Sequence, residues 1–316
     1  MSEEFEPKQP DIAPTTELTP DVAPQVKEFL AETAEANVAE DAAVSEQRDF
    51  AAGAGLEAAS FATTTEVAPY ISFDKVCKSF GDFVVLKDVS FFVNPGETLC
   101  ILGRSGVGKS VSLQILMGFL QADSGTVTVA GQDIGGLNER EMQEVRRKVT
   151  MVFQNGALFD SITVGENVAF PLRERGHMEE DQILQVVKGL LEMVGVAGMG
   201  NMLPSDLSTG MKRSVAIARA LASQPSAVLY DEPTTMVDPL MAHLLGDLIQ
   251  RLKMQLHLTS IVVTHDMRFA EKLADRVVFL HEGTALFFGT MDEMRKSEEP
   301  VIREFFELDE LALLPG

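Results

Sequence analysis

One short stretch of the chain has the residue types and the spacing that hold phosphate groups. It reads G-x-x-x-x-G-K-S and consists of Gly103, Arg104, Ser105, Gly106, Val107, Gly108, Lys109 and Ser110. Glycines let such a loop curl with its backbone N–H groups pointing inward, and a following helix adds the positive end of its dipole. In this pattern the lysine reaches the β- and γ-phosphates and the serine ligates Mg²⁺. We therefore expect a polyphosphate site here rather than an ordinary glycine-rich turn.

The elements on either side of this loop fit the prediction. Residues 98–102 form an apolar run that is short enough to be a buried strand, and residues 111–117 suit a helix. A strand, a glycine loop and a helix in succession are the context in which the motif binds phosphate.

Two carboxylates follow a second apolar run. Residues 227–230 predict a short strand, and Asp231 and Glu232 come directly after it. Because Mg²⁺ prefers oxygen ligands and keeps several waters, Asp231 is expected to hold the ion through water. Glu232 is then free to polarise an attacking water, a division of roles that suits phosphoryl transfer. Taken alone, the pair is equally compatible with surface carboxylates, and the phosphate loop favours the catalytic interpretation.

A histidine and a glutamine end two further predicted strands. His265 follows the apolar residues 260–263, and Gln154 follows residues 151–153. Parallel sheets gather their ligands at the carboxyl ends of their strands. His265 is therefore expected to hydrogen-bond the γ-phosphate or to position the attacking water. The other histidines lack this context and are expected to be structural; they are His177, His243, His257 and His281.

Composition excludes several classes of protein. The 316 residues carry a formal net charge of −22 and a pI near 4.6, whereas nucleic-acid binding shows a basic footprint, so we expect no nucleic-acid partner. Cys77 and Cys100 do not suggest a disulfide framework and fit a reducing compartment. No apolar run approaches the roughly 20 residues of a membrane-spanning helix. We expect no signal peptide, because the first residues lack a basic region and an apolar core.

Residues 1–68 differ in composition from the remainder and are rich in Ala, Glu, Thr and Pro. Through Tyr70, 15 acidic and 3 basic residues give a net charge of −12, which leaves −10 for the rest of the chain. Such a segment buries too little apolar surface to offset its ordering entropy. We expect a disordered acidic extension, with a docking or regulatory tail as the alternative and a transient helix over 24–43.

The remaining chain alternates strands and helices, which favours an α/β fold with a mostly parallel sheet. Its β-rich start is followed by a helical insert over 156–206, in which residues 179–194 have the apolar spacing of an amphipathic helix. The other predicted strands cover 71–73, 83–86, 89–93, 126–130 and 149–153, with a hairpin of 276–280 and 284–288. The other predicted helices cover 138–148, 211–223, 239–254 and 300–314.

Residues 207–213, which read L-S-T-G-M-K-R, resemble the signature sequence of ABC transporter ATPases. With the phosphate loop, Gln154, Asp231, Glu232, Asp238 and His265 in this order, the resemblance extends from Ile71 to Thr290. It implies a P-loop NTPase core over 69–295, built from a mostly parallel sheet, an antiparallel β subdomain and a helical subdomain at about 156–222. Residues 296–316 would then be a C-terminal helical tail.

The same resemblance implies ATP as substrate, Mg²⁺, and a head-to-tail homodimer with two ATP molecules at its interface. Each ATP would be held by one subunit's phosphate loop and the other subunit's signature helix, whose N–H groups suit a phosphate. Phe80 matches the aromatic residue that stacks on adenine, with an ordinary core Phe as the alternative. The implied nucleotide contacts also include Ser208, Gly210 and Asp238. Glu232, His265 and Gln154 would be catalytic, and Ser110, Gln154 and Asp231 would bind Mg²⁺.

A narrower resemblance rests on residues 153–161 and 164–172, which look like the ATPase of Mla/MCE-type lipid transporters (MlaF-like). Met211, where most ABC ATPases have Gln, and the C-terminal tail fit that subfamily. The implied cargo is phospholipid or a related lipid. The implied partners are a multi-span membrane permease, an MCE-domain lipid-binding protein and a STAS-domain regulator. The implied location is cytoplasmic, peripheral on the cytoplasmic face of the inner membrane.

Two positions depart from the family pattern. Thr209 replaces the second signature glycine, and its side chain restricts the backbone there. Met236 replaces a small residue before Asp238. Two other functions stay open on the sequence: the ATPase of an ABC importer for a small solute such as an amino acid, and a soluble ABC-type ATPase outside transport. The acidic balance and the single cassette argue against the second.

Overall fold

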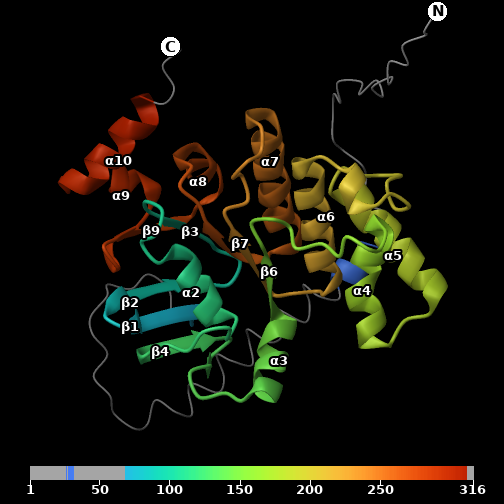
Figure 1. The fold of residues 1–316 in the computed structure, drawn as a ribbon, viewed down its shortest axis with the longest axis horizontal. Coiled ribbons are helices and arrows are strands. Elements are labelled where there is room, and N and C mark those ends of the chain that lie inside the picture. The colour runs from blue at the N-terminus through green and yellow to red at the C-terminus, as the bar shows by residue number, and fades with distance from the viewer. Residues whose placement is uncertain (1–25, 27, 32–67, 312–316) are drawn as a thin grey trace, which may run out of the picture.

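The computed structural model describes residues 26, 28–31 and 68–311, with side chains through residue 308. Figure 1 shows two sheets with helices around them, and α4, α5 and α6 gathered on one side of the molecule. The α/β fold class predicted from the sequence is confirmed.

The larger sheet has six strands, and all its neighbours are parallel except one edge pair. In spatial order they are β10 (Thr284–Gly289), β9 (Arg276–His281), β3 (Thr98–Leu102), β8 (Thr259–Val263), β7 (Ala227–Asp231) and β6 (Val149–Val152). Val263 pairs with Ile101 on one side and with Asp231 on the other. The carboxyl ends of β3, β8 and β7 therefore meet at one edge of the sheet, which places the phosphate loop, His265 and Glu232 together.

The smaller sheet is antiparallel where its register is given. Its order is β2 (Phe83–Val93), β1 (Ile71–Phe80), β4 (Ser124–Val129) and β5 (Gln132–Asp133). The sequence predicted two strands over 83–86 and 89–93, but β2 is continuous. The reason is that Asp88 takes a left-handed φ of 49° and the register shifts there, so the ladder with β1 continues.

Nine α-helices and one 3-10 turn lie within the part of the chain that the structure describes. Seven that matter for the site or the tails are α2 (Lys109–Leu116), α3 (Glu139–Lys148), α4 (Val164–Arg175), α5 (Glu180–Met193), α6 (Thr209–Ala222), α7 (Pro239–Leu256) and α10 (Pro300–Leu311). The others are α8 (Met267–Leu273), α9 (Met291–Arg295) and the 3-10 turn Pro204–Asp206. The helices α4, α5 and α6 fall within the stretch predicted to form the helical subdomain.

Capping explains where two of these helices begin. Asn138 accepts from the N–H groups of Arg140 and Glu141 and so starts α3, as predicted from the sequence. Thr163 starts α4 in the same way, because its hydroxyl accepts from the N–H of Glu166. The sequence did not predict α4, since Pro171 lies inside it and proline usually ends a helix.

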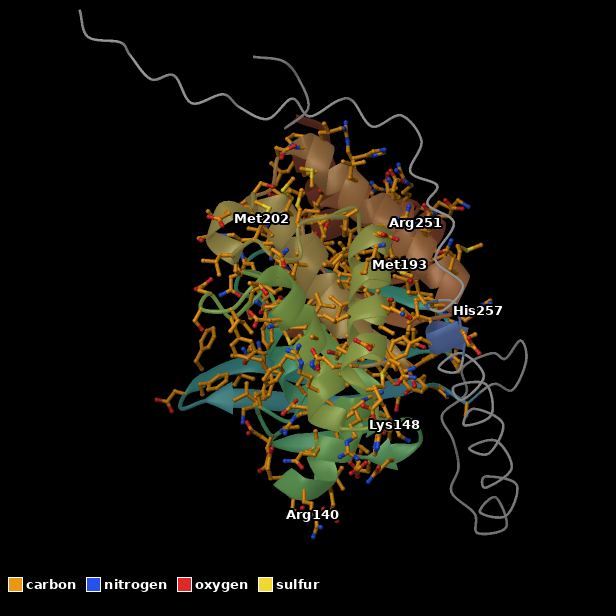
Figure 2. The ribbon with its side chains drawn as sticks, turned by 90° about the vertical axis from the view of Figure 1, so that its right-hand side faces the viewer. Arg140, Lys148, Met193, Met202, Arg251 and His257 are labelled. Carbon is orange, nitrogen blue, oxygen red and sulfur yellow. The ribbon has the colours of Figure 1, made fainter. Side chains whose placement is uncertain are left out.

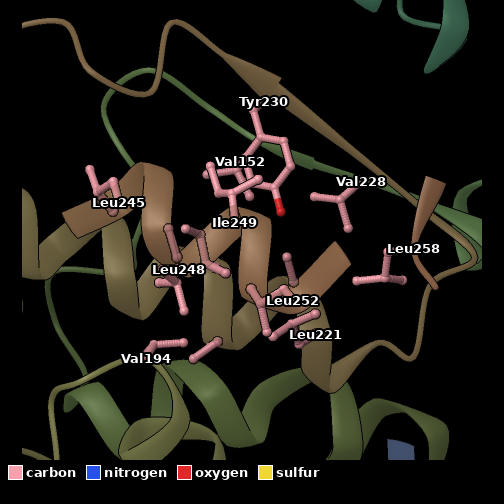
Figure 3. Packing of buried hydrophobic residues seen from close by; sticks show 14 of the residues in the cluster. Val152, Val194, Leu221, Val228, Tyr230, Leu245, Leu248, Ile249, Leu252 and Leu258 are labelled. Atoms are coloured by element: carbon pink, nitrogen blue, oxygen red, sulfur yellow. The ribbon is translucent and has the colours of Figure 1, made fainter. Parts of the chain in front are cut away.

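Alternate residues of β7 enter the two cores on opposite faces of the large sheet. Val228 and Tyr230 belong to one apolar cluster, and Ala227 and Leu229 belong to the other. Figure 3 shows Tyr230 and Val228 above Ile249 and Leu252 of α7. This is the period of two expected of a strand covered on both faces, and it fixes the end of β7 that carries Asp231.

Part of the expected N-terminal extension packs against the helical subdomain. Residues 26 and 28–31 are helical, and Val26 and Leu30 are buried in the core cluster that contains α5. These residues lie within 24–43, where the sequence predicted a transient helix inside the disordered extension. They pack against the core because they bury apolar side chains. The rest of residues 1–67 lies outside the described residues.

The predicted C-terminal helix is present as α10. Its Phe305 packs edge-on against Phe279 of β9, with ring centroids 5.1 Å apart. Residues 312–316 lie outside the described part of the chain. Among the helices that the structure describes, none combines the length and the apolar character needed to cross a membrane.

Candidate functional site

The phosphate loop joins β3 to α2 with the backbone shape that the glycines predict. Gly103, Gly106 and Gly108 all have positive φ, at 144°, 83° and 103°. A Cβ at Gly108 would also lie 2.7 Å from Leu86 Cδ2 and 3.0 Å from Val85 O, so a larger residue would require its neighbours to shift. No side chain caps the start of α2, which leaves its first N–H groups available to an anion.

Lys109 lies inside this loop, with only 5% of its surface exposed. Its Nζ donates to the carbonyl oxygens of Gly103 at 2.8 Å and Arg104 at 3.1 Å. It also lies 3.5 Å from Glu232 Oε1. Burial lowers the pKa of the Lys109 ammonium, and the charge of Glu232 opposes that shift. The loop therefore holds a cation ready for a group that brings negative charge.

Ser110 and Asp231 connect the phosphate loop to the end of β7. Ser110 Oγ donates to Asp231 Oδ1 at 2.8 Å. Burial raises the pKa of the Asp231 carboxyl, and the hydrogen bond from Ser110 partly offsets it. A hydroxyl and a desolvated carboxylate side by side form an oxygen donor set of the kind that Mg²⁺ prefers.

Glu232 sits in a strained and well-held position. Its φ is 47°, a left-handed conformation that disfavours residues with a Cβ by about 1 kcal/mol or more. Its N–H donates to Val263 O at 2.9 Å. Its Oε2 lies 2.7 Å from His265 Nδ1 and accepts from Thr235 Oγ1 at 3.2 Å. Thr235 and His265 therefore fix the direction of this carboxylate, and the bond to Val263 fixes its backbone.

Lys109, Ser110 and Glu232 line one cavity of about 400 Å³, and Asp231 lies behind Ser110 without lining it. Its lining consists of Val85, Ser105, Gly106, Gly108, Lys109, Ser110, Val111, Gln154, Glu232, Thr235 and His265. The structure thus brings the predicted Gln154, Glu232 and His265 to the same space as the phosphate loop. Among the described residues, no group of three or more His, Cys, Asp or Glu side chains could hold a metal ion alone.

The predicted signature residues lie elsewhere. Ser208 caps α6 by accepting from the N–H of Met211, and Asp238 caps α7 by accepting from the N–H of Met241. A Cβ at Gly210 would lie 2.6 Å from Met241 Cε, so this glycine allows α6 and α7 to approach. Ser208, Gly210 and Asp238 are absent from the cavity lining.

Thr209 and Phe80 also lie outside the cavity lining. Thr209 is the first residue of α6 and is not among the residues with positive φ, so its Cβ causes no backbone strain there. Phe80 ends β1 with 47% of its surface exposed and Lys78 Nζ 5.5 Å from its ring centroid. It does not line the cavity, so its contact with adenine stays a prediction.

Sequence reasoning missed two residues that the geometry brings into the site. Thr235 lines the cavity and donates to Glu232, and Arg213 of α6 reaches the backbone of the loops on both sides. The spacing of Thr235 three residues after Glu232 was a usable signal, since side chains in a turn hydrogen-bond over such intervals. Nothing in the sequence indicated the contacts of Arg213.

Comparison with known protein families and proteins gives consistent matches. The model of the ABC transporter family matches residues 86–235. The chain is 39% identical over 227 residues to the intermembrane phospholipid transport system ATP-binding protein MlaF of Haemophilus influenzae, covering 72% of this chain and 86% of that protein. It is 39% identical over 251 residues to the chloroplastic protein TRIGALACTOSYLDIACYLGLYCEROL 3 of Arabidopsis thaliana, covering 73% and 71%. The methionine import ATP-binding protein MetN of Rhizobium johnstonii is also 39% identical, covering 72% and 62%.

Solved structures show the same fold. The dimeric ATP-binding cassette MJ0796 in a post-hydrolysis state, bound to ADP and Pi, superposes with a TM-score of 0.65 at 30% identity, covering 70% of this chain and 98% of that one. The cbiO1 protein of Clostridium perfringens, part of an ABC transporter complex, superposes with a TM-score of 0.68 at 27% identity, covering 78% and 99%.

Proposed function

The chain belongs to the ABC transporter family and is an ATP-hydrolysing enzyme of that fold, and on this premise we propose that it powers a transporter of phospholipids or related lipids. The observation that carries its chemistry is the 2.8 Å hydrogen bond between Ser110 and Asp231. It joins the phosphate loop to the strand end that delivers Glu232, so one cavity contains both the phosphate cradle and the candidate base.

ATP is the substrate of this site. The backbone of residues 103–108 and the ammonium of Lys109 would hold its phosphates, because the loop offers N–H donors and a buried cation. Ser110, Asp231 and Gln154 would hold Mg²⁺ together with water and phosphate oxygens. The ion would supply charge stabilisation to the phosphates. Phe80 would stack on the adenine.

Glu232 is the proposed general base for the attacking water. Its carboxylate is held by Thr235 and His265, which leaves Oε1 toward the cavity side where Lys109 lies. His265 and Gln154 would position the water and the γ-phosphate. Such positioning and charge stabilisation account for most of phosphoryl-transfer catalysis.

A head-to-tail homodimer would complete the site. Ser208 and Asp238 are exposed and cap the starts of α6 and α7, and they do not line the chain's own cavity. They would contact the ATP bound by the other subunit, where the start of α6 offers N–H donors to phosphate. Dimeric solved relatives support this assembly.

The proposal of a lipid cargo rests on the similarity of this chain to two relatives. Two relatives at 39% identity are a phospholipid transport ATP-binding protein and a protein whose name refers to a glycerolipid. The partners would be a multi-span membrane permease, an MCE-domain lipid-binding protein and a STAS-domain regulator, with the chain peripheral on the cytoplasmic face of the inner membrane.

An exposed aromatic pair is the candidate contact with the permease. Phe159 and Phe170 have 45% and 40% of their surface exposed, and their ring centroids lie 5.1 Å apart. Both belong to the stretch after Gln154, whose side chain lines the cavity. Exposed aromatic side chains in a cluster are typical of protein interfaces.

The second candidate function is an importer of a small solute, because a methionine import protein is also 39% identical, although the match covers only 62% of that protein. Affinity purification of the tagged chain from detergent-solubilised native membranes, followed by mass spectrometry, separates the two. We expect a permease together with an MCE-domain protein. A permease with a soluble-solute receptor would favour the importer, and the absence of any membrane protein would contradict transport.

A matched pair of variants tests the contact surface. Phe170→Asp should lose the permease, whereas Leu184→Asp should retain it, because Leu184 is 54% exposed on α5 outside the stretch. Equal recovery of the permease with both variants would contradict the proposed contact.

A further inference from the structure

We infer that Arg213 is a positioning residue that ties the signature helix α6 to the two loops of the hydrolytic site. This inference rests on the proposed roles of Glu232 and Gln154. The guanidinium of Arg213 is buried, with 3% of the residue exposed. One of its nitrogens donates to Phe153 O and another to Thr235 O, both at 3.1 Å.

Each of these carbonyl groups belongs to a loop that lines the cavity. Phe153 directly precedes Gln154, so its carbonyl fixes the backbone from which the Gln154 side chain projects. Thr235 donates its own hydroxyl to Glu232 Oε2 at 3.2 Å. A single side chain therefore sets the spacing between the backbone at Gln154 and a residue that directly holds Glu232.

The chemistry of Arg213 suits this task. A buried cation is unfavourable unless it is hydrogen-bonded and close to a negative charge. Burial lowers the pKa of Arg213, and the negative charge of Asp231 opposes that shift. The planar, forked guanidinium can satisfy two carbonyls in fixed directions, whereas a lysine ammonium is a point charge without this geometry.

The consequence is a mechanical path from the proposed dimer interface to the catalytic groups. Arg213 is on the first turns of α6, the helix that Ser208 caps. A movement of this helix, when it contacts the other subunit's nucleotide, would shift both carbonyl partners at once. Arg213 is not itself one of the residues that line the cavity, so its effect should fall on turnover and not on ATP binding.

The test compares Arg213→Lys and Arg213→Met with the control Arg251→Lys in the full-length protein. Arg251 is a partly buried arginine that donates to Met193 O at 2.8 Å; it lies on the face shown in Figure 2 and is not among the residues that line the cavity. The Arg251 variant therefore measures the effect of losing an arginine–carbonyl hydrogen bond that has no contact with the cavity. The measurements are kcat and KM for ATP, the Kd of a fluorescent ATP analogue, and Tm.

Both Arg213 variants should lower kcat by about tenfold or more, the range expected of misplaced catalytic groups. The Kd should stay within about threefold of wild type, and Tm should fall no further than in the Arg251 variant. Unchanged kcat, or a loss no greater than the unfolded fraction at the assay temperature, would overturn the inference. If the wild type itself fails to hydrolyse ATP, the proposed function fails and the inference with it.

A double-mutant cycle tests the path through Thr235. Thr235→Val removes the hydroxyl that donates to Glu232 but leaves the carbonyl that Arg213 binds. If Arg213 acts through this loop, combining Thr235→Val with Arg213→Lys should reduce kcat by clearly less than the product of the two single effects. If the reduction in kcat of the double variant equals the product of the two single reductions, the two residues act independently. That result would overturn the proposed path from Arg213 through Thr235.

Discussion

His265 Nδ1 lies 2.7 Å from Glu232 Oε2, across the gap between the ends of β8 and β7. Because an ionised carboxylate can only accept, the imidazole is the donor in this pair. The parallel register that pairs Val263 with Asp231 makes the contact possible. The relationship explains how two residues 33 positions apart act on one face of the cavity.

Glu232→Gln should abolish ATP turnover while ATP binding persists. The amide retains the size of the side chain and its left-handed backbone, but it cannot accept a proton. Removing a general base costs roughly 10²- to 10⁴-fold in rate. Steady-state ATPase measurements and a binding assay with a fluorescent nucleotide check this. Hydrolysis in the variant at more than a tenth of the wild-type rate would remove Glu232 from the role of base.

His265→Ala should lower kcat by about 10- to 100-fold, because the Glu232 carboxylate loses one of the donors that direct it. His243→Ala is the control, since His243 is an exposed residue of α7 that pairs with Asp247 on the protein surface. ATPase assays of both variants with Tm measurements check the prediction. Similar rates in the two variants would mean that the contact with Glu232 has no part in turnover.

The sequence predicted the elements whose patterns are local. Apolar runs that end in polar residues predicted the phosphate loop, β7 and β8. Asn138, a residue type that often caps helices, predicted the start of α3. Helix α4 was missed because Gly165 and Pro171 are poor helix formers, although Thr163 and Glu166 form a capping box that was a readable start signal.

Contacts between distant segments could not be predicted. Arg213 meets Phe153 and Thr235 across 60 and 22 positions, and the arginine has the same appearance in the sequence as a surface residue of α6. The docking of Val26 on Gly189 is similar, since both residues are ordinary in their own segments. Only the folded arrangement reveals that each has a specific partner.

Asp231→Asn should raise Tm at neutral pH. Burial raises the folded-state pKa of Asp231, so its contribution to stability is fully present below the ordinary pKa of about 3.9 and is lost as the pH rises through the folded value. The amide avoids this loss, so the gain in Tm should be largest at pH 7 to 8 and shrink toward pH 4.5. Thermal denaturation across this range, without Mg²⁺, measures it.

Asp123→Asn is the control, and the change in Tm expected for it has the opposite sign. The hydrogen bond from Lys78 lowers the pKa of Asp123, so the stabilisation is present above the ordinary value and lost as the pH falls. This variant should lower Tm at neutral pH and approach wild type in acid. A lower Tm for Asp231→Asn at pH 7.5 would contradict the assignment of Asp231 as a desolvated carboxylate kept for binding a cation.

The contact between Val26 and Gly189 predicts that Gly189→Ala lowers the stability of the chain, whereas the same substitution in most helices raises it. Gly189 lies inside α5, where alanine normally stabilises a helix by about 1 kcal/mol. Here a Cβ would overlap Val26 Cγ2, and Gln224 Nε2 holds this segment by donating to Phe29 O at 2.6 Å. Gly189→Ala should therefore destabilise the full chain, as measured by urea denaturation.

In a Val26→Gly background the obstructing side chain is gone, so the same Gly189→Ala change should become stabilising by up to about 1 kcal/mol. Lys188→Ala serves as the control, because Lys188 is an exposed neighbour on α5 and should have the same effect in both backgrounds. A stabilising Gly189→Ala in the otherwise wild-type chain would show that Val26 does not occupy this position in solution. A destabilising effect in both backgrounds would trace the cost to α5 itself and not to the docked segment.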